Sequence, residues 1–168
     1  MTKCLIAYYS RKGQNYVNGR IIDLAEGNTE VIAKKIQAMT GSDIFEIDTV
    51  KEYPIDYTAT TRVAKAELNA DARPELTDSI DNMNEYDTIY LGYPNWWGTF
   101  PMAVFTFLES YDFSGKTIIP FCTHEGSGMG GHSDLSMLCP KAKIEKGIAI
   151  KGSSVHGADH LIQNWLNK

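Results

Sequence analysis

The sequence has few cysteines, no long apolar run and no excess of positive charge. It has three cysteines, an odd number, and none has the CxxC spacing of a zinc or redox site, so we expect free thiols in a cytoplasmic protein. The apolar runs fall far short of the ~20 residues of a membrane helix. Acidic residues outnumber Lys and Arg by 21 to 16, whereas a nucleic-acid binder normally carries a basic stripe. We therefore expect neither a membrane nor nucleic acid as a partner.

The length and composition are those of an ordinary globular domain. The chain has 168 residues, of which 43% are hydrophobic and 22% charged. No repeat or linker divides it, so we expect one domain over residues 1–168.

Short apolar runs alternate with segments of helical periodicity. Five strands are predicted, at residues 4–9, 43–48, 88–93, 117–123 and 144–150. Five helical segments are predicted, at residues 29–39, 60–71, 102–110, 133–138 and 158–167. This alternation predicts an α/β fold, a doubly wound five-stranded parallel sheet of order 2-1-3-4-5 with helices on both faces. In that order ligands bind beyond the carboxyl ends of strands one, three and four, where the strand order reverses.

The segment after the first strand has the residues of an anion site. Ser10 and Arg11 follow the strand, and Asn28 and Thr29 begin the next helix, with Asn28 expected as its N-cap. A helix start offers free amides and a partial positive charge. This segment fits a phosphate cradle, but taken alone it fits a plain capped helix after a long loop somewhat better.

The segment after the third strand carries two adjacent tryptophans. Because neighbouring side chains point in different directions, Trp96 and Trp97 cannot both enter the core. One is expected to pack under the following helix and the other to stack on a planar ligand. The flanking residues in this loop are Pro94, Asn95 and Gly98.

The segment after the fourth strand is rich in glycine, which lets the backbone approach a ligand closely. Its candidate residues are Thr123, His124, Glu125, Gly126, Ser127 and Gly128. The glycines formally match GxGxxG, but that dinucleotide motif belongs after the first strand. A loop whose backbone encloses a polar heterocyclic ligand fits this position better.

Together these three loops resemble those of the flavodoxin family, and the resemblance covers essentially the whole chain. It implies an FMN cofactor held by phosphate, aromatic and pyrimidine loops. The expected cofactor-binding residues are Ser10, Arg11, Asn28, Thr29, Pro94, Asn95, Trp96, Trp97, Gly98, Thr123, His124, Glu125, Gly126, Ser127 and Gly128.

The sequence departs from the family pattern at two places. Residues 11–26 interrupt a phosphate loop that is usually compact in the family. His124 stands where many flavodoxins carry a stacking tyrosine. The first departure leaves open which residues beyond Ser10, Asn28 and Thr29 touch the phosphate, and the second leaves one flavin face less aromatic.

The resemblance implies a flavodoxin-type electron carrier that serves a redox partner protein. The alternative is an NAD(P)H-dependent FMN reductase acting on a quinone or another small acceptor. Residues 53–57 would then form a wall of the substrate site, although we rank a plain loop higher for this segment.

A phospho-acceptor module would need aspartates after strands one and three, where none stands, and a hydrolase would need a GxSxG elbow. His156 and His160 are four residues apart but isolated, so no metal site is predicted. No catalytic side chain is assigned, because the flavin would carry the chemistry.

Overall fold

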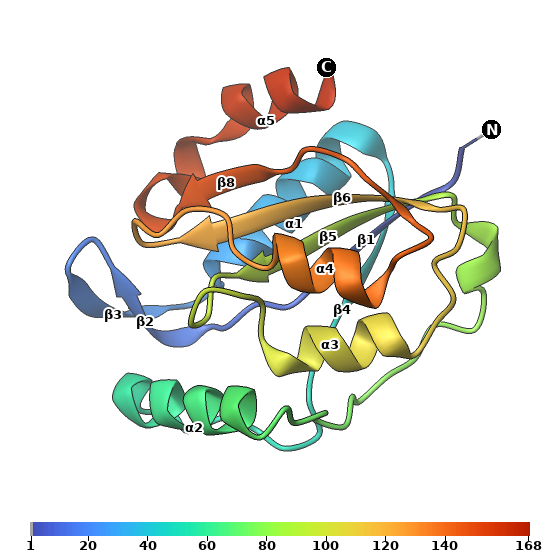
Figure 1. Ribbon diagram of the computed structural model, residues 1–168. Helices are drawn as coiled ribbons and strands as arrows, with labels where there is room; N and C mark the ends of the chain where they lie inside the picture. The colour runs from blue at the N-terminus through green and yellow to red at the C-terminus, as the bar shows by residue number, and fades with distance from the viewer. Residues whose placement is uncertain (1) are drawn as a thin grey trace.

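The computed structural model describes residues 2–168, which form a parallel sheet covered by helices on both faces (Figure 1). The strand order is β4-β1-β5-β6, and β6 carries both β7 and β8 on its outer side. Every pairing in this sheet is parallel. The strands are β1 (Cys4–Tyr8), β4 (Asp43–Glu46), β5 (Thr88–Pro94), β6 (Thr117–His124), β7 (Lys143–Ile144) and β8 (Ile148–Lys151).

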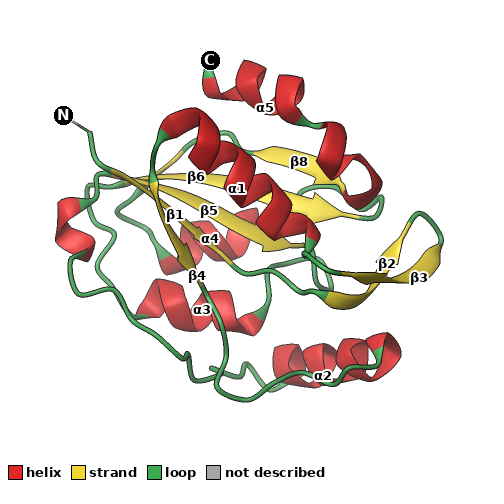
Figure 2. Ribbon diagram, turned by 180° about the vertical axis from the view of Figure 1, so that it is seen from behind, coloured by secondary structure: helices red, strands yellow, loops and turns green. Residues whose placement is uncertain are grey.

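The helices divide between the two faces of the sheet (Figure 2). One face carries α1 and α5, and the other carries α3 and α4, while α2 lies farther out, below α3 in both views. Two short 3-10 turns, η1 (Met83–Glu85) and η2 (Gly152–Gly157), complete the connections. The helices are α1 (Asn28–Thr40), α2 (Tyr57–Asn69), α3 (Met102–Glu109), α4 (His132–Leu138) and α5 (Asp159–Leu166).

The predicted fold class and the predicted order of the parallel strands are confirmed, with one difference. The fifth strand, expected as one run over residues 144–150, is split into β7 and β8. The gap lies opposite Pro120 of β6, which has no N–H to donate to a neighbouring strand. Gly147 sits in the gap, where a Cβ would come within 2.2 Å of the Pro120 carbonyl oxygen.

The interruption after β1 is a β-hairpin outside the main sheet. It consists of β2 (Gly13–Val17) and β3 (Arg20–Leu24), paired antiparallel. Asn18 and Gly19 form the turn with positive φ at both positions, 52° and 84°, the conformation of a two-residue type I′ turn. The hairpin projects at the carboxyl ends of the strands (Figure 1), where the predicted ligand site lies.

Apolar side chains from the sheet pack into both helical layers. Ile89 and Leu91 of β5 enter the core under α3 and α4, and Ile6 and Tyr8 of β1 enter the core under α1 and α5. Gly92 is required between the strands, because a Cβ there would lie 2.1 Å from the ring of Phe121. The sheet end is therefore a rigid platform for the loops beyond it. No helix within residues 2–168 combines the length and the apolarity needed to cross a membrane.

The three thiols are free, and two are buried. Cys122 and Cys139 are 1% and 5% exposed, and burial raises the pKa of each to about 11. Burial also raises the pKa of the partly exposed Cys4. We expect a thiol reagent at pH 8 to modify at most Cys4 in the native protein and all three cysteines after unfolding. Rapid native labelling of Cys122 would contradict this packing.

Candidate functional site

A crevice at the carboxyl ends of β1, β5 and β6 brings the three predicted loops together. It consists of two adjoining cavities that share Arg11, Asn15, Tyr57, Asn95 and Trp96. The cavity at the start of α1 has a volume of about 160 Å³. The cavity between the tryptophan loop and α2 has a volume of about 300 Å³. The two are called here the helix end and the tryptophan end of the crevice.

The helix end is built on the first turn of α1. Gly27 is the N-cap, so the prediction of Asn28 in that position is wrong, and Asn28 is instead the first helical residue. Gly27 has no side chain to cap the helix, and Ser10, which lies just beyond β1, does so instead. Its Oγ accepts a hydrogen bond from Glu30 N at 3.0 Å. Within residues 2–168, the amides of Asn28 and Thr29 have no hydrogen-bond partner. Two free amides and the helix dipole favour an anion at this point.

Two buried hydroxyl groups join the first and third loops. Thr29 and Thr123 are 2% and 4% exposed, and their Oγ1 atoms lie 2.8 Å apart in a hydrogen bond. This bond fixes the start of α1 against the end of β6. The floor of the helix end is therefore preformed.

Arg11 lines the crevice, but its side chain is already engaged. Its Nε donates to the Gln14 carbonyl oxygen at 3.0 Å, and its Nη2 donates to the carbonyl oxygens of Pro54 and Ile55 at 3.1 and 3.0 Å. Arg11 thus ties the hairpin to the segment before α2. Its guanidinium serves as a structural brace here, and its part in binding a phosphate stays a prediction.

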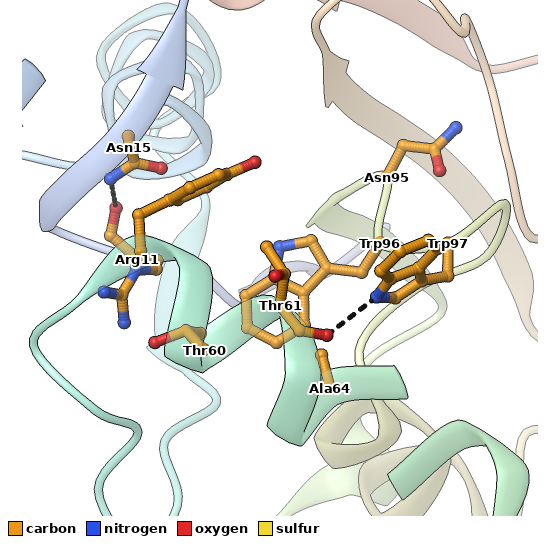
Figure 3. Close-up of a pocket in the computed structure, with 9 residues that line it drawn as sticks. Arg11, Asn15, Thr60, Thr61, Ala64, Asn95, Trp96 and Trp97 are labelled. Carbon is orange, nitrogen blue, oxygen red and sulfur yellow. Dashed lines mark hydrogen bonds between the residues drawn. The ribbon is translucent and has the colours of Figure 1, made fainter. Parts of the chain in front are cut away.

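The two tryptophans of the second loop behave differently (Figure 3). Trp96 packs edge-on against Tyr9 and Tyr53, each with ring centroids 5.3 Å away. Burial raises the pKa of Tyr9, and burial with a 2.6 Å hydrogen bond to Glu67 raises the pKa of Tyr53, so both phenols are protonated at neutral pH. Trp96 therefore rests on an uncharged aromatic base and lines both ends of the crevice.

Trp97 reaches across the tryptophan end to α2. Its Nε1 donates to the Thr61 carbonyl oxygen at 3.1 Å, and the Lys65 ammonium lies 4.8 Å from its ring centroid. Trp97 is 54% exposed and has a φ of +56°, a left-handed conformation that is costly for a bulky residue. Backbone strain of this kind gathers at ligand sites.

The third loop is held by bonds to the second. Asn95 donates to the Gly128 carbonyl oxygen at 3.0 Å and accepts from Gly98 N at 2.9 Å. Glu125 accepts a bond from the hairpin amide of Asn18 at 3.3 Å, while its Oε1 is buried with no donor among the described residues. A buried carboxylate oxygen without a hydrogen-bond donor costs free energy.

The structure brings together most of the residues predicted for the site. The helix end is lined by ten of them: Arg11, Asn28, Thr29, Pro94, Asn95, Trp96, Thr123, His124, Glu125 and Ser127. Trp97 lines the tryptophan end. The remaining four, Ser10, Gly98, Gly126 and Gly128, line neither cavity and shape the loops that do.

Six residues that line the crevice were not among those predicted. Asn15 and Tyr16 come from the hairpin, and Tyr57, Thr60, Thr61 and Ala64 come from α2. Tyr57 belongs to the segment 53–57, for which a plain loop was the preferred prediction. The rings of Tyr16 and Tyr57 stack with centroids 6.2 Å apart. The Asn18-Gly19 dipeptide was the available signal, since it predicts a hairpin turn in this segment. No comparable signal placed the hairpin against α2.

Within residues 2–168, no three His, Cys, Asp or Glu side chains gather closely enough to hold a metal ion. The crevice instead offers amides and a carboxylate at one end and aromatic rings at the other.

A comparison with known protein families shows to which family the chain belongs. The model of a family described as Flavodoxin matches residues 20–168. The chain belongs to the flavodoxin family. The resemblance drawn from its three loops is therefore confirmed, and with it FMN as the family's cofactor. A search among curated protein sequences finds no match.

Solved structures of flavoproteins share the fold of this flavodoxin family member. A protein from Bacteroides uniformis assigned as a flavoprotein is 29% identical, with a TM-score of 0.75 over 96% of this chain and 98% of that one. Another so assigned, from Bacteroides eggerthii, is 26% identical, with a TM-score of 0.73 over 97% and 99%. A Lactobacillus acidophilus flavoprotein in complex with FMN is 23% identical, with a TM-score of 0.65 over 94% and 98%.

Proposed function

We propose that this chain binds one FMN along the crevice and uses it for electron transfer. The phosphate would lie at the start of α1, on the amides of Asn28 and Thr29, and the isoalloxazine would lie against Trp96 and Trp97. The flavin supplies the redox chemistry, while the protein binds it, orients it and sets its electrostatic surroundings.

The main observation behind this proposal is that the two ends of the crevice differ in chemistry. An anion fits the free amides of Asn28 and Thr29, and the aromatic lining of the tryptophan end suits a planar ring. FMN carries both groups, a phosphate and a planar ring, in one molecule. The FMN found in the Lactobacillus acidophilus relative also supports the proposal.

Within this function, we propose a flavodoxin-type carrier that exchanges electrons with a protein partner. Residues 67–87 form an acidic stretch that is exposed at most of its carboxylates, which suits a partner with a basic surface. Opposite charge on a partner would raise the association rate.

A second candidate is an NAD(P)H-dependent reductase with a small acceptor such as a quinone. One observation favours it. Tyr57, Thr60, Thr61 and Ala64 of α2 wall the tryptophan end, so the aromatic part of the ligand faces a protein surface that could also hold a small acceptor.

An anaerobic stepwise reduction of the FMN-loaded protein, followed by its absorption spectrum, separates the two roles. A carrier should accumulate the one-electron-reduced state and react slowly with NADH or NADPH. A reductase should pass directly to the two-electron-reduced state and be reduced by one of these nucleotides. The second pattern would contradict the carrier role while leaving FMN binding intact.

The cap supplied by Ser10 makes a separate prediction. Replacing Ser10 with alanine removes the acceptor of the Glu30 amide, which should cost about 1 kcal/mol of stability, as loss of a helix cap does. It should also weaken FMN more than riboflavin, because only FMN carries the phosphate at this helix start. Chemical denaturation and two parallel flavin titrations measure both effects. Equal losses for the two flavins would place the phosphate elsewhere.

A further inference from the structure

We propose that the turn from His124 to Gly126 fixes His124 as a hydrogen-bond donor to the flavin ring and thereby raises the flavin's reduction potential. The inference rests on the proposed FMN site. It assigns a role to His124, which lines the helix end of the crevice.

The turn holds the imidazole by one nitrogen. The backbone N–H of Gly126 donates to His124 Nδ1 at 2.9 Å. Gly126 reaches this position with a φ of +129°, which L side chains rarely adopt. A Cβ there would meet nothing within 4 Å, so the backbone conformation, rather than space, calls for glycine.

This bond decides which ring nitrogen carries the proton. In a neutral imidazole one nitrogen donates and the other accepts. Because Nδ1 accepts from Gly126, the proton lies on Nε2. His124 lines the helix end of the crevice, so Nε2–H is the group that the ring can offer to a ligand there.

The strand geometry points the side chains of Thr123 and His124 to opposite faces of the sheet. Successive side chains of a strand point to opposite faces. Thr123 points to α1, where it bonds Thr29, so the next residue of β6, His124, points to the other face. His124 shares the helix end with Trp96, which also lines the tryptophan end, so we infer that Nε2–H meets an acceptor nitrogen or oxygen at the edge of an isoalloxazine that lies against Trp96. These atoms gain negative charge on reduction, so a donor there binds reduced flavin more strongly than oxidised flavin.

The first test reads the tautomer in the full chain without flavin. Long-range ¹H–¹⁵N correlation of the neutral rings should show His124 protonated on Nε2. His132, His156 and His160 are exposed and serve as internal references. Gly126→Ala should turn the His124 signal into a mixture of tautomers. A His124 ring protonated on Nδ1 in the unaltered protein would overturn the inference.

The second test measures the two-electron potential of the bound flavin in two variants. His124→Met has no donor and should bind reduced FMN about tenfold less tightly relative to oxidised FMN, which is a fall of about 30 mV. His124→Gln places an amide N–H near the position of Nε2 and should restore most of the potential. The same shift is expected with riboflavin, because the phosphate is not involved.

The outcomes separate this inference from the proposed function. A potential unchanged in His124→Met, or a shift seen with FMN but not with riboflavin, would overturn the contact with the ring while FMN binding stands. An unaltered protein that binds no flavin would overturn the proposed function and the ring contact together, and the tautomer measurement would still decide the role of Gly126.

Discussion

Replacing Trp96 with alanine should weaken FMN binding roughly 10- to 100-fold, in line with the ~1–3 kcal/mol that loss of an aromatic stacking partner costs. Trp96 lines both ends of the crevice and is held edge-on by Tyr9 and Tyr53. Its removal takes away a ring surface on which the flavin would stack and the packing partner of Tyr9 and Tyr53. Riboflavin should lose the same factor, because the loss falls on the isoalloxazine.

Two variants control for the size of the lost side chain. Trp96→Phe keeps an aromatic face and should recover most of the affinity. Trp165→Ala removes another partly buried tryptophan, which packs on Tyr90 away from the crevice. It should lower stability while leaving the dissociation constant of FMN unchanged. If Trp96→Ala binds FMN as tightly as the unaltered protein, the ring does not lie at the tryptophan end.

Replacing Gly27 with alanine should lower FMN affinity about 100-fold and remove most of the preference for FMN over riboflavin. A Cβ at this position would lie 2.1 Å from Ser10 Oγ and 2.6 Å from the Arg11 carbonyl oxygen. The loop must then move away from α1, which misplaces the amides of Asn28 and Thr29. Loss of charge-assisted bonds to a phosphate costs about 1.5–3 kcal/mol each.

Gly157→Ala is the matched control, because a Cβ at Gly157 meets nothing within 4 Å. It should leave both flavin affinities unchanged. For Gly27→Ala, calorimetric titration with FMN and with riboflavin separates loss of the phosphate site from general damage. An equal fall for both flavins would show that the helix start does not hold the phosphate.

The sequence predicted well those features that depend on local pattern. Continuous apolar runs such as residues 88–93 marked the central strands, and their order followed from general rules for parallel sheets. The three loops beyond β1, β5 and β6 were predicted because strand ends meet at one edge of such a sheet. The resemblance to the flavodoxin family came from these same loops.

The features that the sequence did not reveal depend on contacts between distant segments. Arg11 lines the helix end as predicted, but the sequence did not show that the carbonyl groups of Pro54 and Ile55, more than forty positions away, hold its guanidinium. Asn28 has a good N-cap side chain, yet Ser10 from the end of β1 does the capping. Pro120 lies inside the predicted strand at residues 117–123, which forms as one strand, while the interruption appears in the neighbouring pair, β7 and β8.

The central claim is that one FMN lies along the crevice with its phosphate at the start of α1. Titration of the flavin-free protein with FMN and with riboflavin, followed by quenching of flavin fluorescence, tests it most directly. We predict saturation at one FMN per chain, strong quenching by the nearby tryptophans, and markedly weaker binding of riboflavin. A protein that binds neither flavin, or binds both equally well, would contradict the account.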